Sequence, residues 1–135
     1  MLLVDTSLWV ATYRDPSGGV SARVQAAMGG EDHVFCQMTR IELLQGCRNE
    51  KEWEKTLEFL DDQEYRELGR EGWTDAAKMY FDYRRQGDTV RSTLDCCIAQ
   101  SCLDHDATLL HTDRDFEVIA TIRPLKQRRI EIQVP

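Results

Sequence analysis

The sequence predicts an α/β fold with a central, mainly parallel sheet. Short apolar runs that are typical of buried strands alternate along the chain with longer segments that have the apolar periodicity of helices. Strands that are joined through helices run parallel, because a parallel connection needs a long crossover. The 135 residues contain no internal repeat and no long linker, so we expect a single domain over residues 1–135.

Five short segments are candidate strands. Most are apolar runs of the length that buried strands have, and the last one alternates apolar and polar residues, which is typical of an edge strand. The sheet should therefore contain four to five strands. In chain order the segments are 2–4, 33–36, 65–68, 108–110 and 130–134.

Seven longer segments are candidate helices. Apolar residues recur three or four positions apart in them, and glycine, proline or small polar residues stand near several of their ends. Residues 72–86 form the longest, and Gly87 directly after it suits the C′ position of a helix. In chain order the segments are 7–13, 21–28, 39–48, 50–60, 72–86, 93–105 and 112–120.

Composition and charge narrow the classes of function. Acidic residues outnumber basic residues by 24 to 17, giving a net charge of −7, which argues against binding nucleic acid or membrane by simple electrostatic attraction. A nuclease is still compatible with this charge, because metal-binding carboxylates can supply much of the excess. The chain has no apolar run near the ~18–20 residues of a membrane span, and residues 1–5 lack the features of a signal peptide. We therefore expect a cytoplasmic protein with no membrane partner.

Carboxylates gather where the predicted sheet has its carboxyl edge. Asp5 stands at the end of the first predicted strand, Asp113 lies just past the predicted strand at 108–110, and Asp115 is two residues further on. Glu42 and Asp95 each fall in the first turn of a predicted helix. Ligands of parallel α/β sheets bind beyond the carboxyl ends of the strands, so these acids are expected to lie together. Such oxygen ligands suit Mg²⁺ and Mn²⁺.

Helix capping is the alternative explanation for these acids. Glu42, Asp95 and Asp115 each stand three residues after a serine or threonine, which is the spacing of a capping box. Taken singly, each of the three is better explained as a helix cap than as a metal ligand. Asp5 fits this explanation less well, because a carboxylate that ends a buried strand needs a partner. If all the acids were caps, the chain would be a catalytically silent acidic binding module.

Four segments that carry these acids together resemble a known family. They are MLLVDTSLWV at 1–10, IELLQG at 41–46, DCCIA at 95–99 and TDRDF at 112–116. In order and spacing they closely resemble the PIN-domain ribonucleases, and in detail the VapC toxins of bacterial toxin–antitoxin pairs. The resemblance covers nearly the whole chain, and four motifs in the family's order make it specific.

This resemblance implies a three-layer α/β/α PIN-like fold and a toxin that is an Mg²⁺- or Mn²⁺-dependent endoribonuclease. It implies a cognate VapB-type antitoxin as inhibitor and a homodimer as the expected assembly. By position, the family's catalytic, metal-binding acids fall on Asp5, Glu42, Asp95 and Asp113, and Asp115 matches a further metal ligand.

Two other residues are candidates for binding substrate. Thr112 matches the hydroxyl that the family carries beside its metals. Residues 87–92 resemble a subset of these toxins that cleave tRNA, which makes tRNA the favoured target, with another RNA or DNA as the alternative. Arg91 in that segment is either a ligand of a substrate phosphate or a solvated loop residue.

Overall fold

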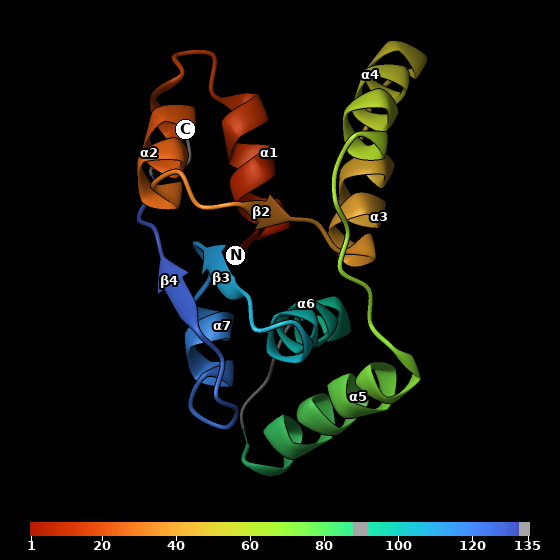
Figure 1. Cartoon of the computed structure of the whole chain (residues 1–135), viewed down its shortest axis with the longest axis vertical. Helices are drawn as coiled ribbons and strands as arrows, with labels where there is room; N and C mark the ends of the chain where they lie inside the picture. The colour runs from red at the N-terminus through yellow and green to blue at the C-terminus, as the bar shows by residue number, and fades with distance from the viewer. Residues whose placement is uncertain (88–91, 133–135) are drawn as a thin grey trace.

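The computed structural model describes residues 1–87 and 92–132 (Figure 1). Within these residues the chain forms four strands and seven helices, and each predicted helix is present with its ends shifted by no more than three residues. In order the elements are β1 (Leu2–Val4), α1 (Thr6–Arg14), α2 (Gly19–Met28), β2 (His33–Val34), α3 (Gln37–Gln45), α4 (Glu50–Asp61), α5 (Arg70–Arg85), α6 (Thr93–Asp104), β3 (Thr108–His111), α7 (Arg114–Ile119) and β4 (Gln127–Arg129).

The four strands form one parallel sheet in the order β2-β1-β3-β4, which confirms the predicted α/β class. β1 lies between β2 and β3, with Leu3 opposite Val34 on one side and Leu109 on the other. All three residues of β1 are buried. A central strand of this kind directs its carboxyl end, and the residue that follows it, into the middle of the sheet edge.

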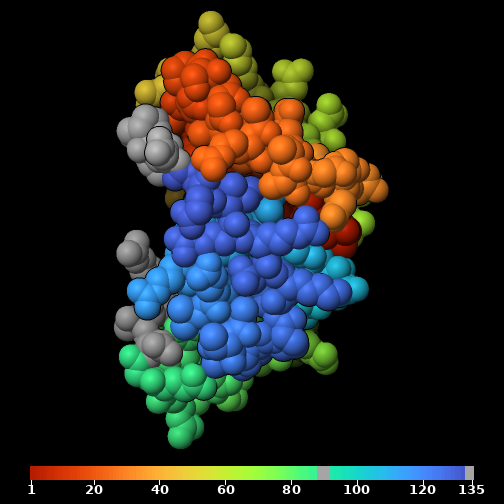
Figure 2. Space-filling view, turned by 90° about the vertical axis from the view of Figure 1, so that its left-hand side faces the viewer, coloured from red at the N-terminus to blue at the C-terminus, as the bar shows by residue number. Residues whose placement is uncertain are grey.

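Helices cover both faces of the sheet and make three layers (Figure 1). Successive residues of a strand point to opposite faces. Leu3 and Leu109 accordingly join the larger core cluster, formed with α5, α6 and α7, whereas Val4 and Leu110 pack against Leu8, Val20 and Val24 of α1 and α2. Figure 2 shows one side of the molecule, on which α2, β4 and α7 follow one another.

The strand predictions at 65–68 and 130–134 were wrong. Around Tyr65 the chain makes an isolated parallel bridge to Phe35 and no strand. The last strand is β4 at Gln127–Arg129, before the predicted segment. Ile130 and Ile132 instead turn their side chains onto the α1–α2 core, and residues 133–134 lie outside the described part.

The ends of the long helix α5 agree with the glycine pattern. Gly87 follows the helix with φ of +81°, the left-handed conformation predicted for its C′ position. Near the start of the same helix, Gly72 permits a close contact with α6, because a Cβ there would lie 2.6 Å from Asp104 Oδ2. Among the described residues, none of the helices has the length and apolar composition of a membrane span.

Candidate metal centre

A pocket of about 620 Å³ opens at the carboxyl edge of the sheet and is lined by acidic side chains. Asp5 reaches it from the end of β1, and Asp113 from the turn between β3 and α7. Glu42 projects from α3 and Asp95 from the first turn of α6. Acids that are up to 108 positions apart in sequence therefore meet where the parallel sheet was expected to gather them.

Asp5 is the most enclosed of these acids, with 5% of its surface exposed. It is also the N-cap of α1: the backbone N–H of Ser7 donates to Asp5 Oδ2 at 3.2 Å, and the Ser7 hydroxyl donates to the same oxygen. The expectation that Asp5 fits a cap less well than the other acids was therefore wrong. Burial raises the pKa of the Asp5 carboxyl, and the hydrogen bonds from Ser7 oppose that rise.

Glu42 is held by a hydroxyl of a different helix. Thr6 Oγ1 donates to Glu42 Oε1 at 3.1 Å and lies 3.3 Å from Thr39 Oγ1. Because α3 begins at Gln37 with Cys36 as its N-cap, Thr39 is inside the helix and Glu42 is in its second turn. The capping-box explanation of Glu42 was therefore wrong. Burial raises the pKa of Glu42, as does the negative charge of Asp5, while the Thr6 hydrogen bond lowers it.

Asp95 and Asp113, which line the pocket, form a close group with Asp115 beside it. Each offers a carboxylate oxygen, and the three oxygens lie within 4.8 Å of one another. Burial, together with the smaller effects of the negative charges of Asp5, Asp113, Glu42 and Asp115, raises the pKa of Asp95 to about 7. All five acids identified from the sequence therefore lie close enough to affect the pKa of Asp95 or, for Asp95 itself, to be affected by the others.

The turn that carries Asp113 is fixed by a buried histidine. Asp113 Oδ1 accepts the backbone N–H of Asp115 at 2.9 Å, so Asp113 is the N-cap of α7. Its own backbone N–H donates to His111 Nδ1 at 3.1 Å, which leaves Nε2 of that ring to donate to Gln127 Oε1 at 2.6 Å. His111 is fully buried, and its ring packs against Phe116. The edge strand β4 thereby orients a carboxylate in the pocket.

The two candidate substrate-binding residues, Thr112 and Arg91, differ in whether the structure describes them. Thr112 lines the pocket, half-buried, between β3 and α7. Arg91 lies outside the described residues. Sequence reasoning missed Arg14, which also lines the pocket. Its signal was available: Arg14 follows Thr6 and Val10 at intervals of four residues, which places all three on one face of α1.

The chemistry of the donors fits a hard divalent cation. Two carboxylates about 5 Å apart repel by roughly 3 kcal/mol at an effective dielectric near 20, so the four acids that line the pocket, with Asp115 beside them, disfavour a charged Asp95. Bound Mg²⁺ or Mn²⁺ would remove this repulsion, and carboxylate oxygens are the ligands that both ions prefer. The raised pKa of Asp95 is the expected property of such a cluster before an ion neutralises it.

Comparisons with known proteins agree with the fold and the acidic pocket. Residues 2–122 match the family model of the PIN domain. Ribonuclease VapC11 of Mycobacterium tuberculosis (strain H37Rv) is 34% identical over 131 residues, covering 93% of this chain and 96% of that protein. VapC ribonuclease Mb1587 of Mycobacterium bovis shows the same identity and coverage.

Two solved structures have the same fold. VapBC2 from Rickettsia felis, bound to a DNA fragment from its promoter, superposes with a TM-score of 0.77 at 14% identity, over 96% of this chain and 98% of the other. FitAcB from Neisseria gonorrhoeae gives a TM-score of 0.71 at 19% identity, over 94% and 96% of the two chains.

Proposed function

Because the chain belongs to the PIN-domain family, as a ribonuclease of the VapC type, we propose that it hydrolyses RNA phosphodiesters with Mg²⁺ or Mn²⁺ as cofactor. The observation that carries this proposal is the pocket lined by Asp5, Glu42, Asp95 and Asp113, in which these acids and the neighbouring Asp115 help raise the pKa of Asp95 to about 7. Helix capping accounts for Asp5 and Asp113, and the first-turn position of Asp95 after the N-cap Ser92 suits the α6 dipole, but neither explains Glu42. A metal centre accounts for all of them.

Asp5, Glu42, Asp95 and Asp113 are the proposed catalytic ligands, and Asp115 is a further one. A bound divalent cation supplies charge stabilisation to the phosphoryl group and lowers the pKa of a water. The chain's residues do the rest: a carboxylate of the cluster accepts the proton of the attacking water, and the Thr112 hydroxyl binds the substrate. In-line attack by water leaves a 5′-phosphate and a 3′-hydroxyl.

tRNA is the substrate class that we propose first, because residues 87–92 resemble the tRNA-cleaving subset of these toxins. In this proposal Arg91 binds a substrate phosphate. Another RNA, or DNA, is the alternative target of the same pocket. The partner that we propose is a VapB-type antitoxin, which the similarity to solved complexes such as VapBC2 and FitAcB supports. The chain would then be the toxin of a type II toxin–antitoxin system.

The test is cleavage of total tRNA by the purified protein with Mn²⁺, Mg²⁺ or EDTA. The control is Asp5→Asn protein purified identically, since asparagine can still accept the Ser7 N–H and cap α1. We expect discrete metal-dependent fragments that carry 5′-phosphates, and a rate at least about 100-fold lower for the variant.

Three results would contradict parts of this proposal. Equal activity in both preparations would show a contaminant or remove Asp5 from the ligands. A 2′,3′-cyclic phosphate product would exclude attack by water. Absence of cleavage together with absence of metal binding would identify a silent acidic binding module.

We also propose that the chain is a homodimer. Trp73 and Phe81 of α5 are half-exposed and lie about two helical turns apart on the solvent side of that helix. Large apolar side chains that share an exposed face are typical of contact surfaces. Sedimentation at micromolar concentration should give twice the chain mass of 15.6 kDa. A single-chain mass over the whole concentration range would overturn this proposal.

A further inference from the structure

A second, larger cavity adjoins the acidic pocket. It has a volume of about 950 Å³ and lies between α1, α3 and α4. We call it the aromatic groove, because Trp9, Tyr13 and Phe59 are among the residues that line it. The groove and the acidic pocket share Val10, Arg14 and Glu42 as lining residues, so the two spaces meet along one face of α1.

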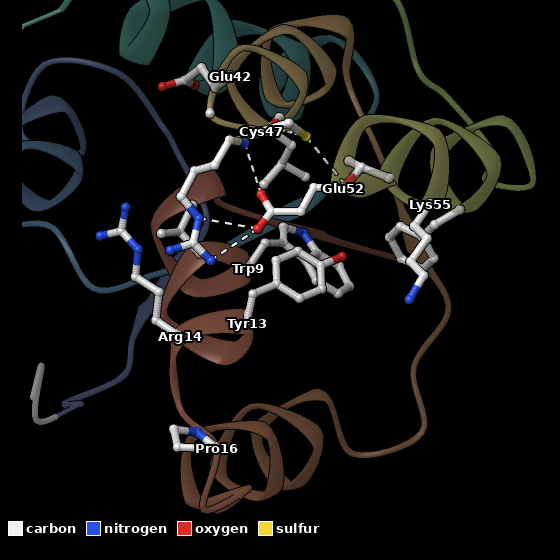
Figure 3. Close-up of a pocket in the computed structure, with 14 residues that line it drawn as sticks. Trp9, Tyr13, Arg14, Pro16, Glu42, Cys47, Glu52 and Lys55 are labelled. Atoms are coloured by element: carbon white, nitrogen blue, oxygen red, sulfur yellow. Dashed lines mark hydrogen bonds and ion pairs between the residues drawn. The ribbon is translucent and has the colours of Figure 1, made fainter. Parts of the chain in front are cut away.

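The aromatic side chains offer both a rigid base and an exposed ring. Trp9 stacks on Phe35 with ring centroids 5.1 Å apart and meets Phe59 edge-on at 5.9 Å. Tyr13 follows Trp9 by one helical turn and is 57% exposed (Figure 3). An exposed ring beside a fixed indole is the arrangement on which a nucleobase can stack.

The charges of the groove complement a polyanion. Glu52 is engaged by Arg48, whose Nη2 donates to Glu52 Oε1 at 2.9 Å and whose backbone N–H donates to Oε2 at 2.8 Å. Arg14 and Lys55 lie on opposite sides of the two aromatic rings (Figure 3). Among the described residues neither of these two cations has an ion pair. Both are therefore available to phosphate groups.

We propose that the aromatic groove binds the RNA nucleotide that flanks the scissile phosphate. Its base stacks on Tyr13, Arg14 binds the phosphate that joins it to the acidic pocket, and Lys55 binds the next phosphate outward. This inference rests on the proposed function, because an RNA strand whose scissile phosphate lies at the acids must extend from the acidic pocket into the space next to it. The aromatic groove continues the acidic pocket and carries aromatic rings and the cations Arg14 and Lys55.

The experiment measures kcat/KM on a short RNA that spans a mapped cleavage site, and on copies with an abasic nucleotide on either side of that site. Tyr13→Ala should lower kcat/KM on the intact RNA by roughly 5- to 100-fold, the usual contribution of one stacked base. The loss should disappear on one of the two abasic copies. Trp53→Ala removes an exposed aromatic ring of α4 that lines neither cavity, and should leave kcat/KM unchanged.

Arg14→Gln has a separate readout. The variant should raise KM more than it lowers kcat, and the slope of log affinity against log salt should fall by about 0.7, the value for one phosphate contact on a single strand. Arg23→Gln is the matched control, because Arg23 is an exposed arginine of α2 that lines neither cavity. Affinity is measured in EDTA by fluorescence anisotropy of the labelled RNA, so this readout does not depend on cleavage.

Each result decides the proposal. If the wild-type protein cleaves RNA and both groove variants match it in kcat/KM and salt slope, the groove proposal fails while the nuclease proposal stands. If Tyr13→Ala leaves RNA cleavage unchanged but weakens inhibition by a protein partner, the groove binds that partner and the RNA assignment is overturned. If the wild-type protein neither cleaves nor binds RNA, both proposals fail.

Discussion

Asp95→Asn is expected to lower RNA cleavage by roughly 10²- to 10³-fold or more while making the metal-free protein more stable above pH 7. The loss of activity follows from removing a proposed ligand. The gain in stability follows from the pKa of Asp95, which burial and four neighbouring acids raise from 3.8 to about 7. A carboxyl whose pKa is raised on folding stabilises the protein below its unfolded pKa, and that contribution is lost as the pH rises through its folded pKa.

The difference in melting temperature between Asp95→Asn and the wild type should therefore grow from about pH 4 to about pH 7 and stay constant above. Allowing for solvent screening and for a lost interaction with the α6 dipole, we expect a gain of about 1–2 kcal/mol, or roughly 3–8 °C. Thermal denaturation in EDTA across this pH range measures it. A variant that is inactive and also less stable at pH 8 would contradict this explanation of the site.

Asp106→Asn is the matched control for that experiment. Asp106 is exposed, precedes β3 whereas Asp113 follows the other end of that strand, and is paired with Lys126 at 2.7 Å. Its φ of 52° is a conformation that asparagine also adopts readily. The pairing lowers the pKa of Asp106, which is the opposite shift to that of Asp95. The control variant should therefore keep full activity and gain no stability at high pH.

Removal of divalent cations is expected to abolish cleavage, and restoring them should stabilise the protein more at pH 8 than at pH 6. Below pH 7 a cation must displace a proton from Asp95, so its affinity should fall by up to about 10-fold per pH unit. At 100 times the dissociation constant, the ion should add about 2.7 kcal/mol to the free energy of unfolding.

Thermal shift titrations with Mn²⁺ at the two pH values, and calorimetry in buffers of different ionisation enthalpy, measure this linkage. Proton release on binding should be close to one at pH 6 and small at pH 8. Asp95→Asn should bind the ion more weakly and with little pH dependence. Equal titration midpoints at pH 6 and pH 8 for the wild-type protein would contradict the prediction.

The sheet and the meeting of the acids were predictable because they depend on patterns that buried strands impose. The runs at β1 and β3 are apolar since both strands lie inside the sheet, and parallel strands bring Asp5 and Asp113 to one edge. β4 was missed because its sequence, Gln-Arg-Arg, lies at an edge where polar side chains reach solvent and leave no apolar signal.

The local roles of the acids were less predictable. The N-cap of α3 is Cys36, whose side chain makes no capping hydrogen bond, so the sequence pointed to Thr39 as the cap although Thr39 lies inside the helix. The hydrogen bond that holds Glu42 comes from Thr6, 36 positions away, and no local pattern indicates a contact of that range. Capping by Asp5 depends on the backbone conformation at the turn into α1, and the apolar periodicity of the sequence does not indicate that conformation.

The link from Gln127 through His111 to the backbone of Asp113 has a consequence for biosynthesis. The chain is made from its N-terminus, so the acids from Asp5 to Asp115 are all synthesised before the side chain that orients the His111 ring. A nascent chain that has not yet extended through β4 carries all five acids of the site, but it lacks the Gln127 side chain that orients His111 and, through it, Asp113. The fully ordered site thus requires a chain that has been extended through β4, which delays its formation until Gln127 has been added.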